Sequence, residues 1–243
     1  MAVVLSSRGG GRVVNYFEVG IVGYGGGVSP ILAGSDSGHL IVPVEQLAKN
    51  PLRVDSATLR APDGAGGFLL VDMARPVWVE PRAYGAAPMV GAFSALEPVV
   101  ASWCASHPAS FPPIVINVTG GKSADGDPRE VGKRIRNLRT EDGHALLFNV
   151  HLSGGRNRPL YFPNSSADLL DSEAAILYEL SSELPMSMRE AAASLGYAVS
   201  KGARGLVYNS DELAATDLLE IGTRSVTPNG LHELVSAGRG VRG

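Results

Sequence analysis

The segment Ile114–Pro128, which reads IVINVTGGKSADGDP, constrains the fold of this chain more than any other part of the sequence. Its first part, Ile114–Val118, is short, apolar and rich in β-branched residues, which indicates a strand covered on both faces of a parallel sheet. Asp127 and Pro128 are typical of the first positions of a helix. The loop Thr119–Gly126 therefore follows the carboxyl end of a central strand, where open α/β sheets bind their ligands.

Strands and helices alternate through the second half of the chain. This alternation predicts an α/β fold with a doubly wound, mostly parallel, Rossmann-like sheet. The expected strands are Tyr16–Tyr24, Leu40–Val44, extended Phe68–Glu80, Ile114–Val118, Ala145–Leu152 and Arg204–Tyr208. The expected helices are Met89–Ala105, Pro128–Arg139, Asp168–Glu183, one that Ser187 caps and Gly196 ends, and Asp211–Ile221, which Ser210 caps and Gly222 ends. Asn50–Gly67 is rich in Pro, Gly and Asp and is expected to be an excursion or turn.

Length and composition limit the class of protein. A chain of 243 residues can bury one sizeable core, so one domain is expected over 16–222, with a linker or remnant over 1–15 and a flexible tail over 223–243. A net charge of −3 gives no reason to expect nucleic acid or an acidic membrane as partner. The single cysteine, Cys104, excludes an internal disulfide, and no long uncharged apolar run or leader is visible, so a soluble cytoplasmic protein is expected.

Several segments carry a family resemblance when they are taken together in order. They are FEVGIVGYGGGV at Phe17–Val28, PVWVEP at Pro76–Pro81, GAAPM at Gly85–Met89, VTGGKSADGDP at Val118–Pro128, LLFNVHLSG at Leu146–Gly154 and GLVYNSD at Gly205–Asp211. In this order and spacing the chain resembles a von Willebrand factor type A (VWA) domain of the bacterial intracellular type.

The resemblance implies a divalent-cation site at the carboxyl edge of the sheet, but the ligands that it requires are replaced here. The family pattern has a DxSxS motif after the first strand, a Thr in the next loop and an Asp after the fourth strand. This chain has Ala87 in place of the Thr and Gly120 in place of the Asp, with Lys122 close by, and the DxSxS segment is missing. Because Mg²⁺ prefers oxygen ligands and these are replaced, we expect a degenerate site that binds no metal. We also expect no cofactor and no catalytic residue.

The same resemblance implies a missing first strand and helix. Few residues precede Phe17, and a parallel crossover connection takes a dozen residues or more. Either the chain is a fragment, or the apolar segment Ala2–Leu5 substitutes for the strand without its helix. We therefore expect exposed sheet edges that allow self-association.

The resemblance further implies a non-catalytic protein–protein interaction module, an adaptor in a bacterial regulatory system, with another protein as its partner. The expected contact surface is made of loops at the carboxyl edge of the sheet. Its candidate binding residues are Gly25, Gly26, Ala87, Thr119, Gly120, Lys122, Ser123, Asp125 and Arg156.

An alternative from a different class is a nucleotide- or phosphate-binding α/β protein that uses the Gly120–Ser123 loop. GGKS between a strand and a helix is similar to a phosphate-binding loop, but Ile116 stands where that motif requires its first glycine. Asp125 and Asp127 are explained by capping and turn formation more simply than by a shared cation. His151, in an apolar strand, is expected to be a hydrogen-bonded residue of the sheet.

Overall fold

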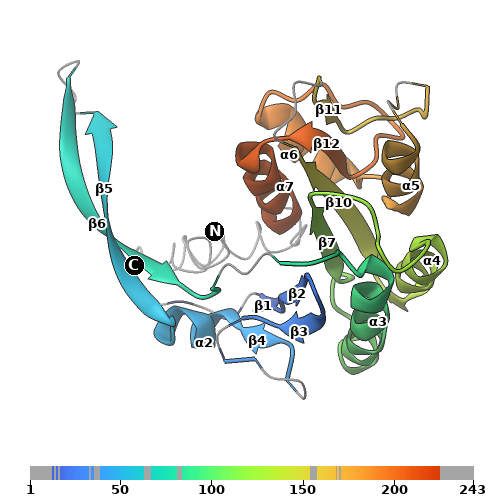
Figure 1. The fold of residues 1–243 in the computed structure, drawn as a ribbon, viewed down its shortest axis with the longest axis horizontal. Coiled ribbons are helices and arrows are strands. Elements are labelled where there is room, and N and C mark those ends of the chain that lie inside the picture. Colours follow the sequence, from blue (N-terminus) through green and yellow to red (C-terminus); the bar gives the residue numbers. More distant parts are fainter. Residues whose placement is uncertain are drawn as a thin grey trace, which may run out of the picture. The chain divides into compact units, whose positions relative to one another are not determined.

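The computed structural model describes residues 13, 15, 17–32, 34–35, 39–62, 67–80, 84–153, 158–167, 169 and 171–224. These residues form two compact units (Figure 1). Unit 1 contains Tyr24–Val28 and the described chain from Gly85 onward, and unit 2 contains the described residues before Tyr24 and those of Ser29–Tyr84. The range 16–222, which the sequence predicts as one domain, extends over both units.

The sheet of unit 1 is mixed but mostly parallel. Its strand order is β11-β12-β10-β7, where β7 is Ile114–Thr119, β10 is Leu146–Leu152, β12 is Leu206–Ser210 and β11 is Leu160–Tyr161. β10 runs parallel to both β7 and β12, whereas β11 is antiparallel to β12. The mixed α/β character and the mainly parallel pairing agree with the sequence prediction.

The helices of unit 1 supply two separate apolar clusters. They are α3 (Met89–Ser106), α4 (Arg129–Asn137), α5 (Ser172–Leu180), α6 (Met186–Ser194) and α7 (Glu212–Arg224). The first cluster joins α3, α4 and α5 to Leu147 of β10, and the second joins α6 and α7 to the next residue, Phe148. Because successive strand residues point to opposite faces, the two clusters lie on opposite faces of the sheet.

Helix α3 is the one described helix whose length and composition would allow it to cross a membrane. Its buried residues are Met89, Ala92, Phe93, Val100 and Cys104, and those of its side chains that enter the first cluster pack there with β7 and β10. The core of unit 1 therefore accounts for part of the apolar content of this helix, of which 28% is buried. Cys104 is a free, buried thiol.

The described part of unit 2 contains short strands, one helix and a long hairpin. β1 (Glu18–Val19) pairs with β4 (Val42–Pro43), and β2 (Val22–Tyr24) pairs with β3 (Val28–Pro30). Helix α2 (Val44–Lys49) follows β4 directly. Leu32, Val42 and Leu47 form its small core, on which Trp78 packs. The strand expected over Tyr16–Tyr24 is thus divided in two at Gly20 and Ile21, and the strand expected over Leu40–Val44 ends where α2 begins.

The prediction that Asn50–Gly67 is an excursion or turn was wrong. β5 (Arg53–Pro62) and β6 (Phe68–Val77) form an antiparallel ribbon in continuous register, from Arg53 opposite Val77 to Pro62 opposite Phe68 (Figure 1). The Pro, Gly and Asp residues that suggested a turn are concentrated around one end of the ribbon, after Ala61. Their number concealed the alternating sequence that precedes them.

The helices and strands predicted in unit 1 are present, with shifted ends. Ser187 lies inside α6, whose N-cap is Pro185, so the predicted serine cap is wrong. Gly222 lies inside α7 instead of ending it, and Asp211 rather than Ser210 accepts the Ala214 N–H at the start of that helix. The hairpin of β8 (Arg139–Thr140) and β9 (Gly143–His144) was not predicted. The segment Ala2–Leu5 and the tail from residue 225 lie outside the described residues.

Candidate functional site

Three loops of unit 1, far apart in sequence, are joined by backbone hydrogen bonds near the carboxyl end of β7. The Gly26 N–H donates to the Ala86 carbonyl at 3.0 Å, and the Ala124 N–H donates to the Ala87 carbonyl at 2.9 Å. Gly85 has φ +73°, and a Cβ on it would lie 2.9 Å from the Gly26 Cα, so the first two loops touch closely enough to require glycine. The predicted residues Gly26, Ala87 and the Thr119–Asp125 loop are thus brought together.

Asp125 fixes the third of these loops to the start of α3. Its two carboxylate oxygens accept the N–H groups of Val90 at 3.0 Å and Gly91 at 2.8 Å, and Ser123 Oγ donates to it at 3.0 Å. Pro88, at the N-cap of α3, provides no side-chain cap of its own. Asp125 therefore satisfies two of the N–H groups that every helix leaves open at its start, and its charge complements the helix dipole.

These contacts also explain the ionisation of Asp125. Desolvation by the neighbouring atoms would raise the pKa of this carboxyl, but the hydrogen bonds from α3 and Ser123 outweigh it, so the pKa is lowered from its ordinary value of 3.8. The carboxylate is therefore held charged and directed at N–H donors. A group in this position acts as a structural anion.

The other polar side chains of the Thr119–Asp127 loop are also engaged within the protein. Thr119 Oγ1 donates to the Gly121 carbonyl at 2.7 Å and accepts its N–H at 3.2 Å. Asp127 accepts the Arg129 N–H at 3.0 Å, which is the capping contact predicted from the sequence. Lys122, by contrast, is exposed at the loop surface. The loop therefore presents a fixed backbone and a projecting cation.

The described residues contain no group of three or more His, Cys, Asp or Glu side chains that could hold a metal ion. Ala87 and Gly120 lie in the joined loops and offer no side-chain oxygen, and both oxygens of Asp125 face N–H donors. The donor set that the structure shows here does not fit a divalent cation, which requires several oxygen ligands. Arg156, another predicted binding residue, lies outside the described residues.

A buried polar ladder runs across the sheet below the loops, and the sequence reasoning missed it. The Tyr24 hydroxyl donates to Asn117 Oδ1 at 2.5 Å, Asn117 Nδ2 donates to Asn149 Oδ1 at 2.9 Å, and Asn149 Nδ2 donates to Ser181 Oγ at 3.0 Å. Burial raises the pKa of Tyr24 to about 12, so its hydroxyl remains a donor. The one available signal was the presence of an asparagine in the middle of each of two apolar strands.

A second unpredicted cluster lies at the carboxyl ends of β10 and β12. The His151 ring stacks on the Tyr208 ring with centroids 4.4 Å apart. The Tyr208 hydroxyl donates to the Asp171 carboxylate and lies 2.9 Å from each of its oxygens. Asp171 also caps α5 by accepting the N–H groups of Glu173 and Ala174. The buried Nδ1 of His151 has no hydrogen-bond partner in the described structure, so the expectation of a hydrogen-bonded histidine fails at that atom.

The pKa values of Tyr208 and Asp171 are shifted in opposite directions. Burial, and then the hydrogen bond to Asp171, raise the pKa of Tyr208. Burial would also raise the pKa of Asp171, but hydrogen bonds from Ala174 and Tyr208 outweigh it and lower the pKa. At neutral pH the pair is therefore a neutral phenol that donates a hydrogen bond to a charged carboxylate. This hydrogen bond fixes the N-cap of α5 to β12.

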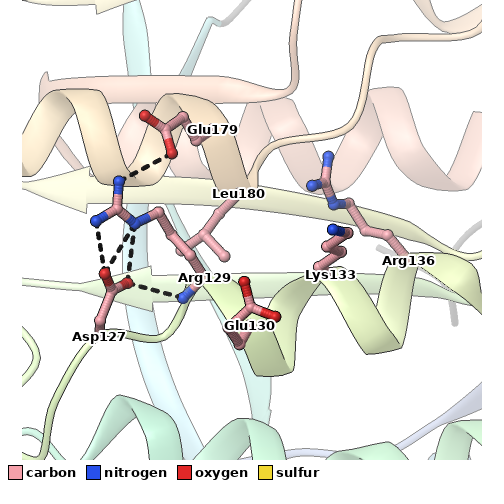
Figure 2. Close-up of a pocket in the computed structure, with 7 residues that line it drawn as sticks. All are labelled: Asp127, Arg129, Glu130, Lys133, Arg136, Glu179 and Leu180. Atoms are coloured by element: carbon pink, nitrogen blue, oxygen red, sulfur yellow. Dashed lines mark hydrogen bonds and ion pairs between the residues drawn. The ribbon is translucent and has the colours of Figure 1, made fainter.

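A surface hollow of about 390 Å³ lies between α4 and α5 (Figure 2). Arg129 occupies one end and bridges Asp127 at 2.6 Å and Glu179 at 3.0 Å. The other lining residues are Glu130, Lys133, Arg136 and Leu180. Charges of both signs line it without converging on one point. None of the described residues that were predicted to bind a partner lines this hollow; Asp127 directly follows the predicted loop.

No protein-family model, no curated protein and no solved structure matches this chain.

Proposed function

We propose that the chain is a non-catalytic protein–protein interaction module of the VWA type, with a doubly wound Rossmann-like sheet, that works without a metal ion. The observation that carries this proposal is the joining of three remote loops into one surface by Gly26–Ala86, Ala124–Ala87 and Asp125–α3 hydrogen bonds. Loops at the carboxyl end of a parallel sheet are the usual place for binding in this architecture. A role as a cytoplasmic adaptor in a bacterial regulatory system belongs to the same proposal.

Prior organisation of the loops is what makes them suitable for recognition. A binding surface that is already ordered loses less conformational freedom when the partner docks. Here the carboxylate of Asp125 and the hydroxyl of Thr119 are used to hold the loop. Exposed Lys122 remains to contact a partner and to favour an acidic group on it.

The proposal is tested by capture from cells of the source organism, with the bound proteins identified by mass spectrometry. We expect Lys122→Glu to lower the captured amount of a specific partner at least tenfold without a change in melting temperature. Arg139→Glu is the matched control, because Arg139 is an exposed cation in β8, which lies at the amino end of β10. If no protein shows this pattern, or if both variants lose the same protein equally, the assignment of the surface is wrong.

The nucleotide-binding alternative can be tested on the same protein. Ser123 Oγ bonds Asp125, and the Asp125 carboxylate already occupies the N–H groups at the start of α3 where an anion would bind. Titration with ATP and with inorganic phosphate, followed by calorimetry, should give no saturable heat. Saturable binding that Lys122→Glu abolishes would favour the alternative.

A further inference from the structure

The two ends of the hollow between α4 and α5 differ in how their charges are paired. At one end, Arg129 forms ion pairs with Asp127 and Glu179, which Figure 2 draws as dashed lines. Toward the other end, Lys133 and Arg136 lie three residues apart on α4 and both line the hollow (Figure 2). Neither of them forms an ion pair with a described residue. This end therefore holds two positive charges that have no carboxylate bound to them in the described structure.

Arg136 is the less usual of these two cations. It is half-buried, and its Nε atom is shielded from solvent without a hydrogen-bond partner among the described residues. Burial, and then the neighbouring charge of Arg204, lower the pKa of Arg136. A guanidinium nevertheless stays protonated in a protein at neutral pH. Arg136 is thus a cation held beside another cation, an arrangement that does not serve the stability of the fold.

Arg204 cannot relieve this charge and has no freedom to move away from it. Its Nη1 donates to the Ser181 carbonyl at 2.8 Å, and its guanidinium lies 4.8 Å from the centre of the Tyr178 ring. These contacts fix Arg204 at the carboxyl end of α5, where a cation complements the helix dipole. The remaining way to compensate Arg136 is an anion that enters from the hollow.

The size of the hollow suits a small molecule. Its volume of about 390 Å³ lies in the range of roughly 300–1,000 Å³ that is usual for small-ligand sites. Leu180 of α5 also lines it and is almost fully buried, so part of the wall is apolar. An apolar wall beside a few polar groups is the usual composition of such sites.

The charges at this end indicate the class of ligand. Glu130, on the same helix, is the one acid among the described lining residues that is not bound to Arg129, so Lys133 and Arg136 leave a surplus of a single positive charge. A singly charged anion balances this surplus, whereas a phosphate dianion would bring excess negative charge close to Glu130. A carboxylate is singly charged, and its two oxygens match the planar fork of a guanidinium.

We propose that the Lys133–Arg136 end of this hollow binds the carboxylate group of a small organic acid. The terminal nitrogens of Arg136 donate to the two carboxylate oxygens, Lys133 adds a second positive charge, and the aliphatic part of the ligand lies toward Leu180. Lys122 does not line the hollow, so the proposal is independent of the loop surface described above.

The test is a titration of the full chain at pH 7, followed by NMR through the backbone amides of α4 and the Nε–H signal of Arg136. The probe is butyrate, and its uncharged amide, butyramide, is the control ligand of the same shape. We expect butyrate to shift the signals of Lys133 and Arg136 and to reach half-saturation at about 1 mM, which is ordinary for so small a ligand. Butyramide and inorganic phosphate should bind at least tenfold more weakly.

Three variants connect the binding to the named charges. Arg136→Gln should raise the half-saturating butyrate concentration at least tenfold without lowering the melting temperature, since its charge is uncompensated in the fold. Glu130→Gln removes the nearby negative charge and should lower that concentration about twofold. Arg134→Gln is the matched control, because Arg134 lies on the same helix but pairs with Glu97 of α3 at 2.8 Å and does not line the hollow.

The possible results separate the proposal from a general effect of charge. Arg134→Gln should change the half-saturating concentration less than twofold, so equal losses from Arg134→Gln and Arg136→Gln overturn the proposal. The absence of saturable shifts with butyrate, or equal binding of butyramide, overturns it as well. Inorganic phosphate that binds as tightly as butyrate overturns the assignment of a carboxylate as the ligand.

Discussion

Replacing Asp125 with alanine should release the start of α3 from the loop that holds it. The substitution removes the acceptor of two helix N–H groups and of Ser123 Oγ. Loss of an N-cap side chain costs about 0.5–2 kcal/mol, and loss of a charge at a helix start costs about 0.3–1 kcal/mol. Since Asp125 is exposed and water can replace part of these bonds, we expect a total of about 1–1.5 kcal/mol.

The effect should be seen in chemical and thermal unfolding of the whole chain. A change of this size lowers the melting temperature by about 2–6 °C in a protein of this length. Asp142→Ala, at an exposed acid in the β8–β9 turn, is the matched control and should change stability by less than about 0.5 kcal/mol. Asp125→Asn retains one acceptor oxygen and should fall between the two.

The dependence on pH gives the result a second check. The pKa of Asp125 is lowered in the folded protein, so its contribution to stability is present above the unfolded value and is lost as the pH falls through the folded value. The difference between the unchanged protein and Asp125→Ala should therefore be constant from pH 7 down to about pH 5 and should shrink below about pH 4. An equal stability of the two proteins at pH 7, or a difference that grows in acid, would refute the capping role.

Two further outcomes can be expected from the same structure. Gly205→Ala should destabilise the protein by about 2–3 kcal/mol in urea unfolding, because the new Cβ would lie 2.1 Å from the buried Phe148 ring. Gly121→Ala is the control, since its Cβ would meet nothing within 4 Å, and it should cost less than about 0.5 kcal/mol. Equal costs for the two variants would show that the Phe148 ring can move aside. Calorimetry with Mg²⁺ or Mn²⁺ should detect no binding site in the unchanged chain or in the double variant Gly120→Asp, Ala87→Thr, since two oxygen ligands do not make a hexacoordinate site. Stoichiometric metal binding by the double variant would show that the missing ligands are not the reason.

The elements that could be predicted from the sequence are those with a strong local pattern. Ile114–Val118 is apolar and β-branched, and Met89–Ala105 repeats its apolar residues at helical spacing, so β7 and α3 are found where they were expected. The ends of helices were less predictable, because a cap depends on which side chain reaches the open N–H groups. Asp125 caps α3 although 34 residues separate it from Gly91, and no local pattern encodes such a contact.

The candidate site was predicted only in outline. That the Thr119–Asp125 loop lies at the carboxyl end of β7 follows from the order of strand and helix, but Gly26 and Ala87 follow no strand of the parallel sheet, and hydrogen bonds bring them to this loop. The ladder through Asn117 and Asn149 was missed, since a single polar residue in an apolar strand gives no indication of its partner. Which polar atoms are satisfied, and by what, is decided by tertiary packing.

The hydrogen bond between Tyr24 and Asn117 has a consequence for the order of folding during synthesis. Its partners are 93 residues apart, whereas the β5–β6 ribbon lies between them and pairs residues that are close in sequence. Hairpins of that kind form in about 1–10 μs, while chain growth takes about 5–20 residues per second. The ribbon can therefore form while Asn117 is still unmade, and the loop at Tyr24–Val28 must wait several seconds for the strand that anchors it. During that interval Tyr24 is available to chaperones or to other nascent chains.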